Sequence, residues 1–449
     1  MTGRTPMASS GKTLSLVDRL LCRLAFRGLT QVTKGTIHLH DYDALTKFGG
    51  EGALQATVQV HEPRLYRDLV LGGSLGAAAA YVRGEWDCDD LTALFRILLQ
   101  NQTASEHLDG LLSRLSGWIQ RGIHRWHANT KSGSHRNIHA HYDLGNDFFR
   151  LWLDDTWAYS CGIFDTPAAT LEEASLEKFD RVCRKLALAQ DDSVLEIGAG
   201  WGGFALHAAQ RYGCRVTTTT ISAEQFEFAR QRMAGAGVAD RVTLLRKDYR
   251  DLAGKFDKLV SLEMIEAVGH EYLNAYFAQC AALLRPEGSL LLQAIVMPER
   301  GYKRYLRTVD FIRRYVFPGG CLPSVSSILD AVGRTGRLRL VHLEDMAPHY
   351  AETLRRWRAN FRRRVDEVRG LGYSAELIRL WDYYLCYCEA AFEERHVGVV
   401  QMVFDNDGCR RDPLAVGQAA SLSRNESLSM NDWESDHPQC VANAGGRAR

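Results

Sequence analysis

The chain of 449 residues lacks the features that mark several large classes of protein. It has no apolar run near the roughly 18–20 residues that a membrane-spanning helix needs. Its first stretch, MTGRTPMASSGKT, lacks the apolar centre of a secretory signal. It also lacks an excess of either charge, because 55 Lys and Arg balance 54 Asp and Glu to a net charge of +1. That balance argues against a protein that coats nucleic acid by charge, and the absences together favour a cytoplasmic protein that reaches membranes from their surface.

The eleven cysteines are scattered. No CxxC pair and no His/Cys cluster at zinc spacing occurs among them, so no metal site is expected. An odd number of cysteines in a long chain is typical of free thiols in a reducing compartment. With 46% hydrophobic and 24% charged residues, the chain has the composition of a globular protein of two or three domains.

The pattern of strands and helices changes along the chain and predicts an N-terminal domain over residues 1–126. Short strands are expected between 35 and 75 and helices over 76–102, which together indicate a small α+β domain. Residues 127–137, HANTKSGSHRN, are polar with Gly and Ser and predict a linker.

Residues 138–407 predict the larger domain. From about residue 190 strands and helices alternate, which indicates an α/β fold with a parallel sheet covered by helices on both faces. The segment 302–320 interrupts this series, residues 352–396 are helical, and residues 397–404 form a closing strand. Residues 408–449, rich in Arg, Ser, Asn, Asp and Gly, predict a disordered tail.

Residues 14–29 have the periodicity of an amphipathic helix. One predicted stripe is apolar, and arginines four residues apart occupy another face. The stripe consists of Leu14, Val17, Leu20, Leu21 and Leu24, and the arginines are Arg19, Arg23 and Arg27. The helix either lies on anionic lipid or docks on its own domain, and the pattern alone favours docking.

The stretch VLEIGAGWGG, residues 194–203, carries a short apolar strand into a loop with four glycines. A strand, a glycine-rich turn and a helix present bare N–H groups to a nucleotide-like ligand. A dinucleotide-binding fold would place a carboxylate at the end of the second strand, but that strand ends in Thr218, Thr219 and Thr220, with no carboxylate before Glu224. A nicotinamide oxidoreductase is therefore disfavoured. With Glu196 inside the strand, the pattern resembles motif I of class I S-adenosylmethionine-dependent methyltransferases.

Seven motifs in one order extend this resemblance over roughly residues 35–405. They are similar to the cyclopropane-fatty-acyl-phospholipid synthase family, which includes the mycolic acid cyclopropane synthases. The motifs are NIHAHYDLGNDFF (137–149), YSCGIF (159–164), EIGAGWGG (196–203), TISAEQ (220–225), DYRDL (248–252), EMIEAVG (263–269) and VFPGGCLPS (316–324). The resemblance implies a Rossmann-like mixed seven-stranded sheet with a helical insertion, association of the N-terminal domain with the lipid substrate, and a possible homodimer.

The resemblance also implies a reaction. The cis double bond of an unsaturated phospholipid acyl chain attacks the sulfonium methyl of S-adenosylmethionine, a carbocation forms, and loss of a proton to bound bicarbonate closes a cyclopropane ring. The enzyme would work at the inner face of the membrane as a peripheral protein. Such a cation needs a dry site lined by aromatic faces, for which the candidates are Tyr142, Phe148, Phe149, Tyr159, Phe164, Trp201, Tyr305, Tyr315 and Phe317.

Several residues match family positions around the bicarbonate. Glu266 matches the glutamate that positions the anion, the backbone of Cys161 is expected to contact it, and Tyr350 is expected to donate a hydrogen bond to it. Cys388 matches another active-site cysteine, although packing is nearly as good an explanation. Gln293 stands where many members have histidine; its amide can donate a hydrogen bond but cannot become cationic.

The remaining matches concern the cofactor. The resemblance assigns Tyr159, Ser160, Glu196, Gly198, Ala199, Gly200, Trp201, Gly202, Thr220, Ile221, Ser222, Gln225, Tyr249 and Arg250 to S-adenosylmethionine. Ser222 would alternatively cap the following helix. His141, together with Tyr142 and Asp143, is expected to form a lid near the cofactor, or else to be a structural histidine.

Three functions therefore stay open. The first is a phospholipid cyclopropane synthase, and the second is a methyltransferase that makes methyl- or methylene-branched lipids, to which the Gln293 departure gives weight. The third is a nucleotide- or lipid-binding module without catalysis. Glu266, Tyr350 and Cys161 speak against the third.

Overall fold

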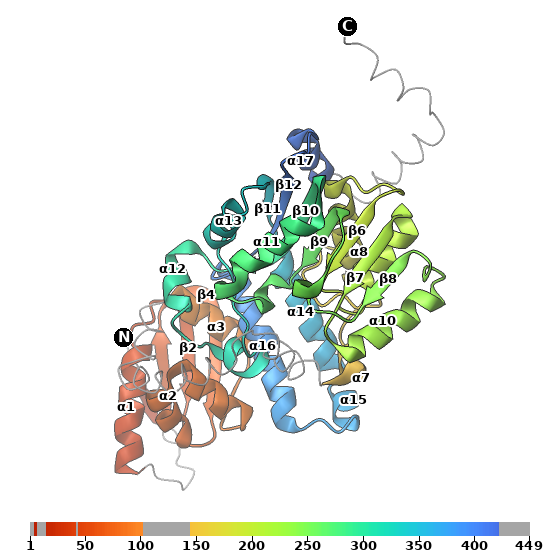
Figure 1. Ribbon diagram of the computed structural model, residues 1–449. Coiled ribbons are helices and arrows are strands. Elements are labelled where there is room, and N and C mark those ends of the chain that lie inside the picture. Colours follow the sequence, from red (N-terminus) through yellow and green to blue (C-terminus); the bar gives the residue numbers. More distant parts are fainter. Residues whose placement is uncertain (1–3, 7–14, 42–43, 102–143, 422–449) are drawn as a thin grey trace.

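The computed structural model describes residues 4–6, 15–41, 44–101 and 144–421, which form two sheets with their helices (Figure 1). The expected linker at 127–137 and the expected lid residues His141, Tyr142 and Asp143 lie outside these ranges.

The N-terminal part holds a five-stranded sheet in the order β1-β3-β2-β4-β5. Buried Ile37, Phe48 and Ile97 lie in the core that joins this sheet to its helices. Asp90 begins the last of these helices, because its side chain accepts a hydrogen bond from the Ala93 N–H. The strands are β1 (Arg4–Pro6), β2 (Lys34–His40), β3 (Ala44–Gly49), β4 (Glu51–Val60) and β5 (Trp86–Cys88), and the helices are α1 (Leu16–Leu29), α2 (Arg64–Val82) and α3 (Leu91–Gln100).

The larger sheet has seven strands in the order β11-β12-β10-β9-β6-β7-β8. All neighbours are parallel except β12, which runs antiparallel to β10 and β11. The strands are β6 (Ser193–Ile197), β7 (Arg215–Thr219), β8 (Val242–Leu245), β9 (Phe256–Leu262), β10 (Leu284–Val296), β11 (Leu338–Asp345) and β12 (Gly398–Asn406). The prediction of a mixed seven-stranded sheet in an α/β fold is confirmed.

Helices cover both faces of this sheet. One face packs on α11 (Leu273–Leu283) and α13 (Val325–Gly333). The other packs on α8 (Leu171–Leu186), α9 (Gly203–His207), α10 (Ala223–Gly235) and α17 (Pro413–Ser421). The shorter elements are α7 (Gly145–Arg150), η1 (Ala208–Tyr212), η2 (Tyr249–Asp251), η3 (Ile265–Ala267), η4 (His270–Tyr272), α12 (Glu299–Tyr305), η5 (Ile312–Val316) and α15 (Val365–Gly370).

Two long helices, α14 (Ala347–Arg363) and α16 (Ala375–Glu393), join the two parts of the molecule. Helix α16 packs along α3 and α2 (Figure 1). The rings of Phe95 and Tyr383 meet across this contact at 4.8 Å between centroids, and Arg379 donates hydrogen bonds to the backbone carbonyls of Tyr81 and Trp86. The N-terminal part therefore shares one apolar core with α14 and α16.

The prediction that residues 408–449 are disordered is wrong for the first part of that segment. Residues 413–421 form α17, which lies on α8 and buries Val416. Arg411 pairs with buried Asp405 of β12 at 2.6 Å, and Arg184 donates to the carbonyl of Ala419. The polar composition of this segment gave no indication of the buried valine or of these arginine contacts. Residues 422–449 lie outside the described ranges.

The predicted apolar stripe of α1 does not coincide with the side of the helix that is buried. Its buried side carries Cys22 and Ala25, whereas Leu20 and Leu24 of the predicted apolar stripe are 59% and 39% exposed. Arg19, Arg23 and Arg27 are exposed as well. The face of α1 that points away from the domain thus carries both apolar and basic side chains. Among the described helices, none has both the length and the apolar character required to cross a bilayer.

Candidate active site

A cavity of about 920 Å³ opens at the carboxyl edge of the seven-stranded sheet and continues toward the N-terminal part. Its walls come from the glycine loop after β6, the loop after β9, the insertion around α12 and η5, and α16. Leu94, Leu98 and Leu99 of α3 line it from the N-terminal part. Open α/β sheets bind ligands at this edge, so the cavity is the candidate active site.

The glycine loop forms one end of the cavity. Gly198, Gly200 and Gly202 all have positive φ, at 99°, 50° and 83°, a region that favours glycine. A Cβ at Gly198 would lie 2.9 Å from Met264, and one at Gly202 would lie 2.6 Å from Met233. A Cβ at Gly200 would meet no protein atom within 4 Å. The loop thus leaves open space beside Gly200, which lines the cavity, whereas Gly202 packs against α10.

Polar side chains surround this end. Glu196 is 2% exposed and accepts a hydrogen bond from Thr218 at 2.6 Å. Its burial raises the pKa of its carboxyl to about 8. Thr220 donates to Gln225 at 2.9 Å, and both line the cavity. Asp248, the first residue of the motif DYRDL, lines it too, although it was not predicted to bind the cofactor.

Three residues predicted to bind the cofactor, Gly202, Ser222 and Arg250, lie outside the cavity lining. Ser222 is not among the lining residues; it begins α10 by accepting a hydrogen bond from the Gln225 N–H. Arg250 does not line the cavity either, because its guanidinium is paired with Asp248 at 2.7 and 2.8 Å. The other predicted cofactor residues, except Gly202, line the cavity: Tyr159, Ser160, Glu196, Gly198, Ala199, Gly200, Trp201, Thr220, Ile221, Gln225 and Tyr249.

Glu263 dominates the other end of the cavity. Its carboxylate accepts three hydrogen bonds, from the Cys161 backbone N–H at 2.9 Å, from Gln293 Nε2 at 2.7 Å and from the Tyr350 hydroxyl at 2.6 Å. Its φ is 50°, a backbone conformation that a residue with a side chain adopts at a cost of order 1–3 kcal/mol. Burial raises the pKa of the Glu263 carboxyl, and the three hydrogen bonds oppose that rise.

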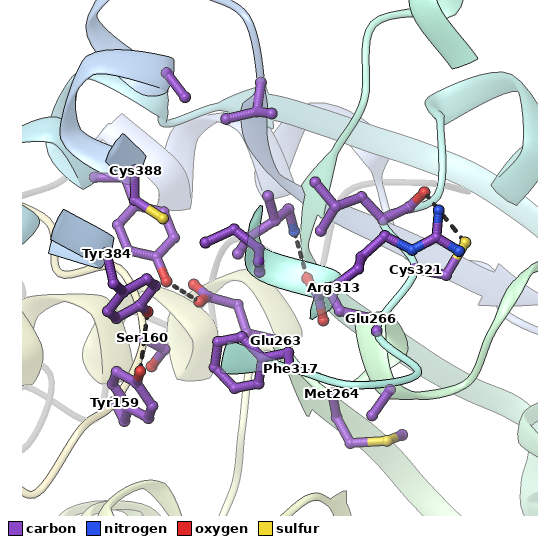
Figure 2. Close-up of a pocket in the computed structure, with 18 of the residues that line it drawn as sticks. Tyr159, Ser160, Glu263, Met264, Glu266, Arg313, Phe317, Cys321, Tyr384 and Cys388 are labelled. Atoms are coloured by element: carbon purple, nitrogen blue, oxygen red, sulfur yellow. Dashed lines mark hydrogen bonds between the residues drawn. The ribbon is translucent and has the colours of Figure 1, made fainter. Parts of the chain in front are cut away.

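Glu266 lies in the same loop but faces different partners (Figure 2). Its Oε1 accepts a hydrogen bond from the Ile295 N–H at 2.5 Å, and its buried Oε2 has no hydrogen-bond partner. Burial, together with the negative charge of Glu263, raises the pKa of Glu266 to about 8. At neutral pH this carboxyl is largely protonated, with one oxygen left for a ligand.

A buried lysine lies close to polar residues from both ends of the cavity. Lys178 of α8 is fully buried and donates to the Ser160 hydroxyl at 2.6 Å. Burial lowers the pKa of Lys178, while the carboxylates of Glu263 and Glu196 act in the opposite sense. Lys178 is therefore close enough to the carboxyl groups of Glu263 and Glu196 to interact with both electrostatically.

The residues predicted to bind bicarbonate do not form an open anion site. Cys161 and Gln293 are fully buried and lie outside the cavity lining. Tyr350, Glu266 and Cys388 do line the cavity. The Cys161 N–H, the Gln293 amide and the Tyr350 hydroxyl, however, are all directed to the carboxylate of Glu263. A protein carboxylate thus occupies the position where the anion was expected.

Of the nine predicted aromatic candidates, four line the cavity: Tyr159, Trp201, Tyr305 and Phe317. Phe148 and Phe149 are fully buried, Phe164 stacks on His349, Tyr315 is 39% exposed, and Tyr142 lies outside the described ranges. Helix α16 adds Tyr383, Tyr384 and Tyr387, which sequence reasoning missed. Figure 2 shows the hydroxyls of Tyr159 and Tyr384 facing each other at 2.9 Å.

The most important omission is Glu263. The motif EMIEAVG contains two glutamates three residues apart, and that spacing directly after a strand at the ligand-binding edge was a usable signal. Asp248 had a similar signal, because it opens the motif DYRDL beside Tyr249. Lys178 had none, because only tertiary packing brings it close to the cavity. No group of three His, Cys, Asp or Glu side chains arranged to hold a metal occurs in the described part of the chain.

Comparison with known proteins gives a consistent picture. Residues 129–402 match the family described as mycolic acid cyclopropane synthetase. The chain is 38% identical over 379 residues to the tuberculostearic acid methyltransferase of Mycobacterium tuberculosis, covering 82% of this chain and 87% of the relative. It is 36% identical over 358 residues to the cyclopropane-fatty-acyl-phospholipid synthase of Escherichia coli, covering 79% of this chain and 88% of the relative.

Solved structures agree with this assignment. The cyclopropane synthase MmaA2 of Mycobacterium tuberculosis superposes with a TM-score of 0.57 at 30% identity, covering 60% of this chain and 98% of that one. The mycolic acid cyclopropane synthase CmaA1, solved with SAH and CTAB, gives the same values. The chain therefore belongs to the mycolic acid cyclopropane synthetase family and is an S-adenosylmethionine-dependent methyltransferase.

Proposed function

We propose that this enzyme methylates the double bond of an unsaturated phospholipid acyl chain and that Glu263, rather than bicarbonate, removes the proton that leaves afterwards. The product that we assign is a methylene-branched acyl chain. The observation that carries the proposal is the position of the Glu263 carboxylate on the Cys161 N–H, the Gln293 amide and the Tyr350 hydroxyl.

The residues at the glycine-loop end fit S-adenosylmethionine. The open space beside Gly200 admits a ligand against bare backbone, and Glu196, Thr220, Gln225 and Asp248 supply polar groups around it. S-adenosylmethionine, when bound there, supplies a methyl group on a sulfonium that an electron-rich carbon can accept.

The middle of the cavity suits a short-lived carbocation on the acyl chain. When the double bond takes up the methyl group, one of its two carbons gains the methyl and the other becomes positive. The lining aromatic rings, among them Tyr159, Phe317 and Tyr384, offer faces that stabilise positive charge in a site that excludes water.

The identity of the base bears on the product. If hydrogen moves with its electron pair from the methyl-bearing carbon to its positive neighbour, the charge shifts to the more substituted carbon. Loss of a proton from the new methyl group to Glu263 then forms a carbon–carbon double bond, which leaves a methylene branch and protonated Glu263. If the proton leaves before the hydrogen moves, the same atoms close a cyclopropane ring.

The contacts of Glu263 favour the branched product. Three hydrogen bonds hold the Glu263 carboxylate in place and make its proton affinity lower than burial alone would give. We propose that the hydrogen shift therefore precedes proton loss. Saturation of the branch would need a reductant from elsewhere. The relatives support both products by name, one as a tuberculostearic acid methyltransferase and one as a cyclopropane-fatty-acyl-phospholipid synthase, so the ring is the second candidate.

Two features support a phospholipid at a membrane. The cavity has an apolar wall from α3 and also includes Arg300 and Arg304, which suit an acyl chain and an anionic head group respectively. The outward face of α1 carries exposed Leu20 and Leu24 beside three arginines, a combination that suits the surface of anionic lipid. We therefore propose peripheral association through α1.

The test is incubation with vesicles of cis-unsaturated phospholipid and S-adenosylmethionine that carries a ¹³C methyl, followed by mass and NMR analysis of the lipid. We expect label in a terminal methylene group of the acyl chain. Label in a cyclopropane carbon would show that the product is the ring and not the methylene branch. Absence of label from every unsaturated phospholipid would contradict the proposal as a whole.

A further inference from the structure

A chain of buried polar side chains crosses three strands of the large sheet. Gln293 of β10 lies opposite Gln401 of β12, and Gln401 lies opposite Glu344 of β11. Gln293 and Gln401 are both fully buried, and the positions beside them in their strands are the apolar residues Leu292, Ala294, Val400 and Met402. Together with Lys185 of α8, which is 1% exposed, these side chains connect the candidate active site with half-buried Glu344. We call Lys185, Gln401 and Gln293 the amide ladder.

The hydrogen bonds of the ladder run in one direction. Lys185 Nζ donates to Gln401 Oε1 at 2.6 Å, Gln401 Nε2 donates to Gln293 Oε1 at 2.9 Å, and Gln293 Nε2 donates to Glu263 at 2.7 Å. The two ends fix this order, because an ammonium can meet only the oxygen of an amide and a carboxylate only its N–H. Each amide dipole therefore turns its negative end to Lys185 and its positive end to Glu263.

The surroundings of both ends are charged. Lys178, Glu266 and the Tyr350 hydroxyl also act on Glu263. Lys185 pairs with Glu344 at 2.5 Å, and Arg181 holds the other oxygen of Glu344 at 2.9 Å. Arg181, Arg184 and His342 are the further charged or titratable groups near Lys185. Burial lowers the pKa of Lys185 to about 8, so its positive charge is present at neutral pH and is lost above that value.

We propose that the amide ladder is a positioning device that keeps the Glu263 carboxylate ionised and fixed by linking it to the charge of Lys185. The aligned amides extend the favourable field of the cation through an apolar sheet, where such interactions are stronger than in water. The role of Glu263 in turnover rests on the proposed function, whereas the link between Lys185 and the ionisation of Glu263 does not.

The test measures the ionisation of Glu263 directly. Infrared difference spectra, or NMR of ¹³C-labelled glutamate carboxyls assigned with Glu263→Gln, give its titration in the absence of lipid. We expect Gln401→Leu, which interrupts the ladder, to raise the pKa of Glu263 by about one unit, a tenfold change in proton affinity. Lys185→Gln keeps a donor without charge and should raise the pKa by a smaller amount. The acid limb of the rate against pH should move upward by the same shifts.

Ser289→Ala is the matched control, because it removes a cross-strand hydrogen bond to Asp405 from the same two strands without touching the ladder. Ser289→Ala should lower the free energy of unfolding by an amount comparable to that for Gln401→Leu, and it should leave the titration of Glu263 unchanged. An unchanged titration in folded Lys185→Gln overturns the proposal even if Gln401→Leu does not fold. If Glu263→Gln stays fully active while ladder variants still shift the titration, the proposed function fails and the ladder stands.

Discussion

The cofactor end of the cavity is centred on the glycine loop after β6, with polar groups added from neighbouring loops. The acceptor end instead brings the Cys161 backbone N–H together with the side chains of Glu263, Gln293 and Tyr350. At the cofactor end the backbone beside Gly200 faces open space. At the acceptor end three hydrogen-bond donors are already engaged by Glu263. The comparison indicates that the first end leaves space for an incoming ligand, whereas at the second end the hydrogen-bond donors already bind a side chain of the protein.

The largest effect should come from removing the anion of the acceptor end. Glu263→Gln keeps the shape but cannot accept the proton at neutral pH, so we expect turnover to fall by about 10²–10⁴-fold. Binding of S-adenosylmethionine, measured by calorimetry, should change less than threefold, because the residue lies at the other end. Turnover within threefold of the unmodified enzyme would contradict the difference between the two ends.

The cofactor end can be broken with Gly200→Val, which fills the open space beside the loop. We expect the dissociation constant for S-adenosylmethionine to rise at least about 100-fold. Gly237→Val is the matched control, since Gly237 also has a positive φ, of 70°, and no atom within 4 Å of a Cβ, but lies outside the cavity lining. Equal weakening in both variants would assign the effect to backbone strain rather than to the ligand.

The burial of Glu266 makes a prediction about stability. Its pKa of about 8 exceeds its ordinary value of 4.5, so between those values the folded state holds a proton that the unfolded state has lost. This carboxyl therefore makes the free energy of unfolding fall as pH rises from about 4.5 to 8. Glu266→Gln should stabilise the protein by about 1–3 kcal/mol at pH 8 and by almost nothing at pH 4.5, as measured by urea unfolding. A stabilisation independent of pH would contradict the assigned titration.

The smallest effect concerns membrane binding by α1. Leu20→Ser with Leu24→Ser removes exposed apolar surface and should weaken sedimentation with anionic phosphatidylglycerol vesicles several-fold. Replacing Arg23 and Arg27 by Gln should cost about 1 kcal/mol for each charge and reduce the dependence on salt. Leu71→Ser, at an exposed position on α2, is the control. If none of these substitutions changes vesicle binding, α1 is not the membrane contact.

The same contrast explains what the sequence could predict. The glycine loop of the cofactor end follows from local chemistry, since strand, glycine turn and helix are contiguous. The alternation of strands and helices likewise predicted a sheet covered by helices on both faces. The seven strands, their mixed direction and the cofactor residues outside the loop came from the family resemblance.

The acceptor end depends on long-range packing, which a single sequence does not state. Cys161, Gln293 and Tyr350 were each predicted to contact an anion, and they do meet around a carboxylate, but that carboxylate belongs to Glu263. Arg250 and Ser222 lie outside the cavity lining, and each is engaged by a residue close in sequence, Arg250 by Asp248 and Ser222 by the Gln225 N–H. Helix α17 was missed because a single buried valine and two arginine contacts hold it.

The most direct measurement of the central claim is the dependence of turnover on bicarbonate in the unmodified enzyme and in Glu263→Gly. The φ of 50° at this position suits glycine, so the variant loses the carboxylate without backbone strain and leaves the Cys161 N–H, the Gln293 amide and the Tyr350 hydroxyl free for a small anion. We predict that the unmodified enzyme is indifferent to added bicarbonate in carbonate-depleted buffer, and that Glu263→Gly is nearly inactive until bicarbonate restores part of its turnover. An unmodified enzyme that requires bicarbonate, with Glu263→Gly equally active and equally dependent, would contradict the account.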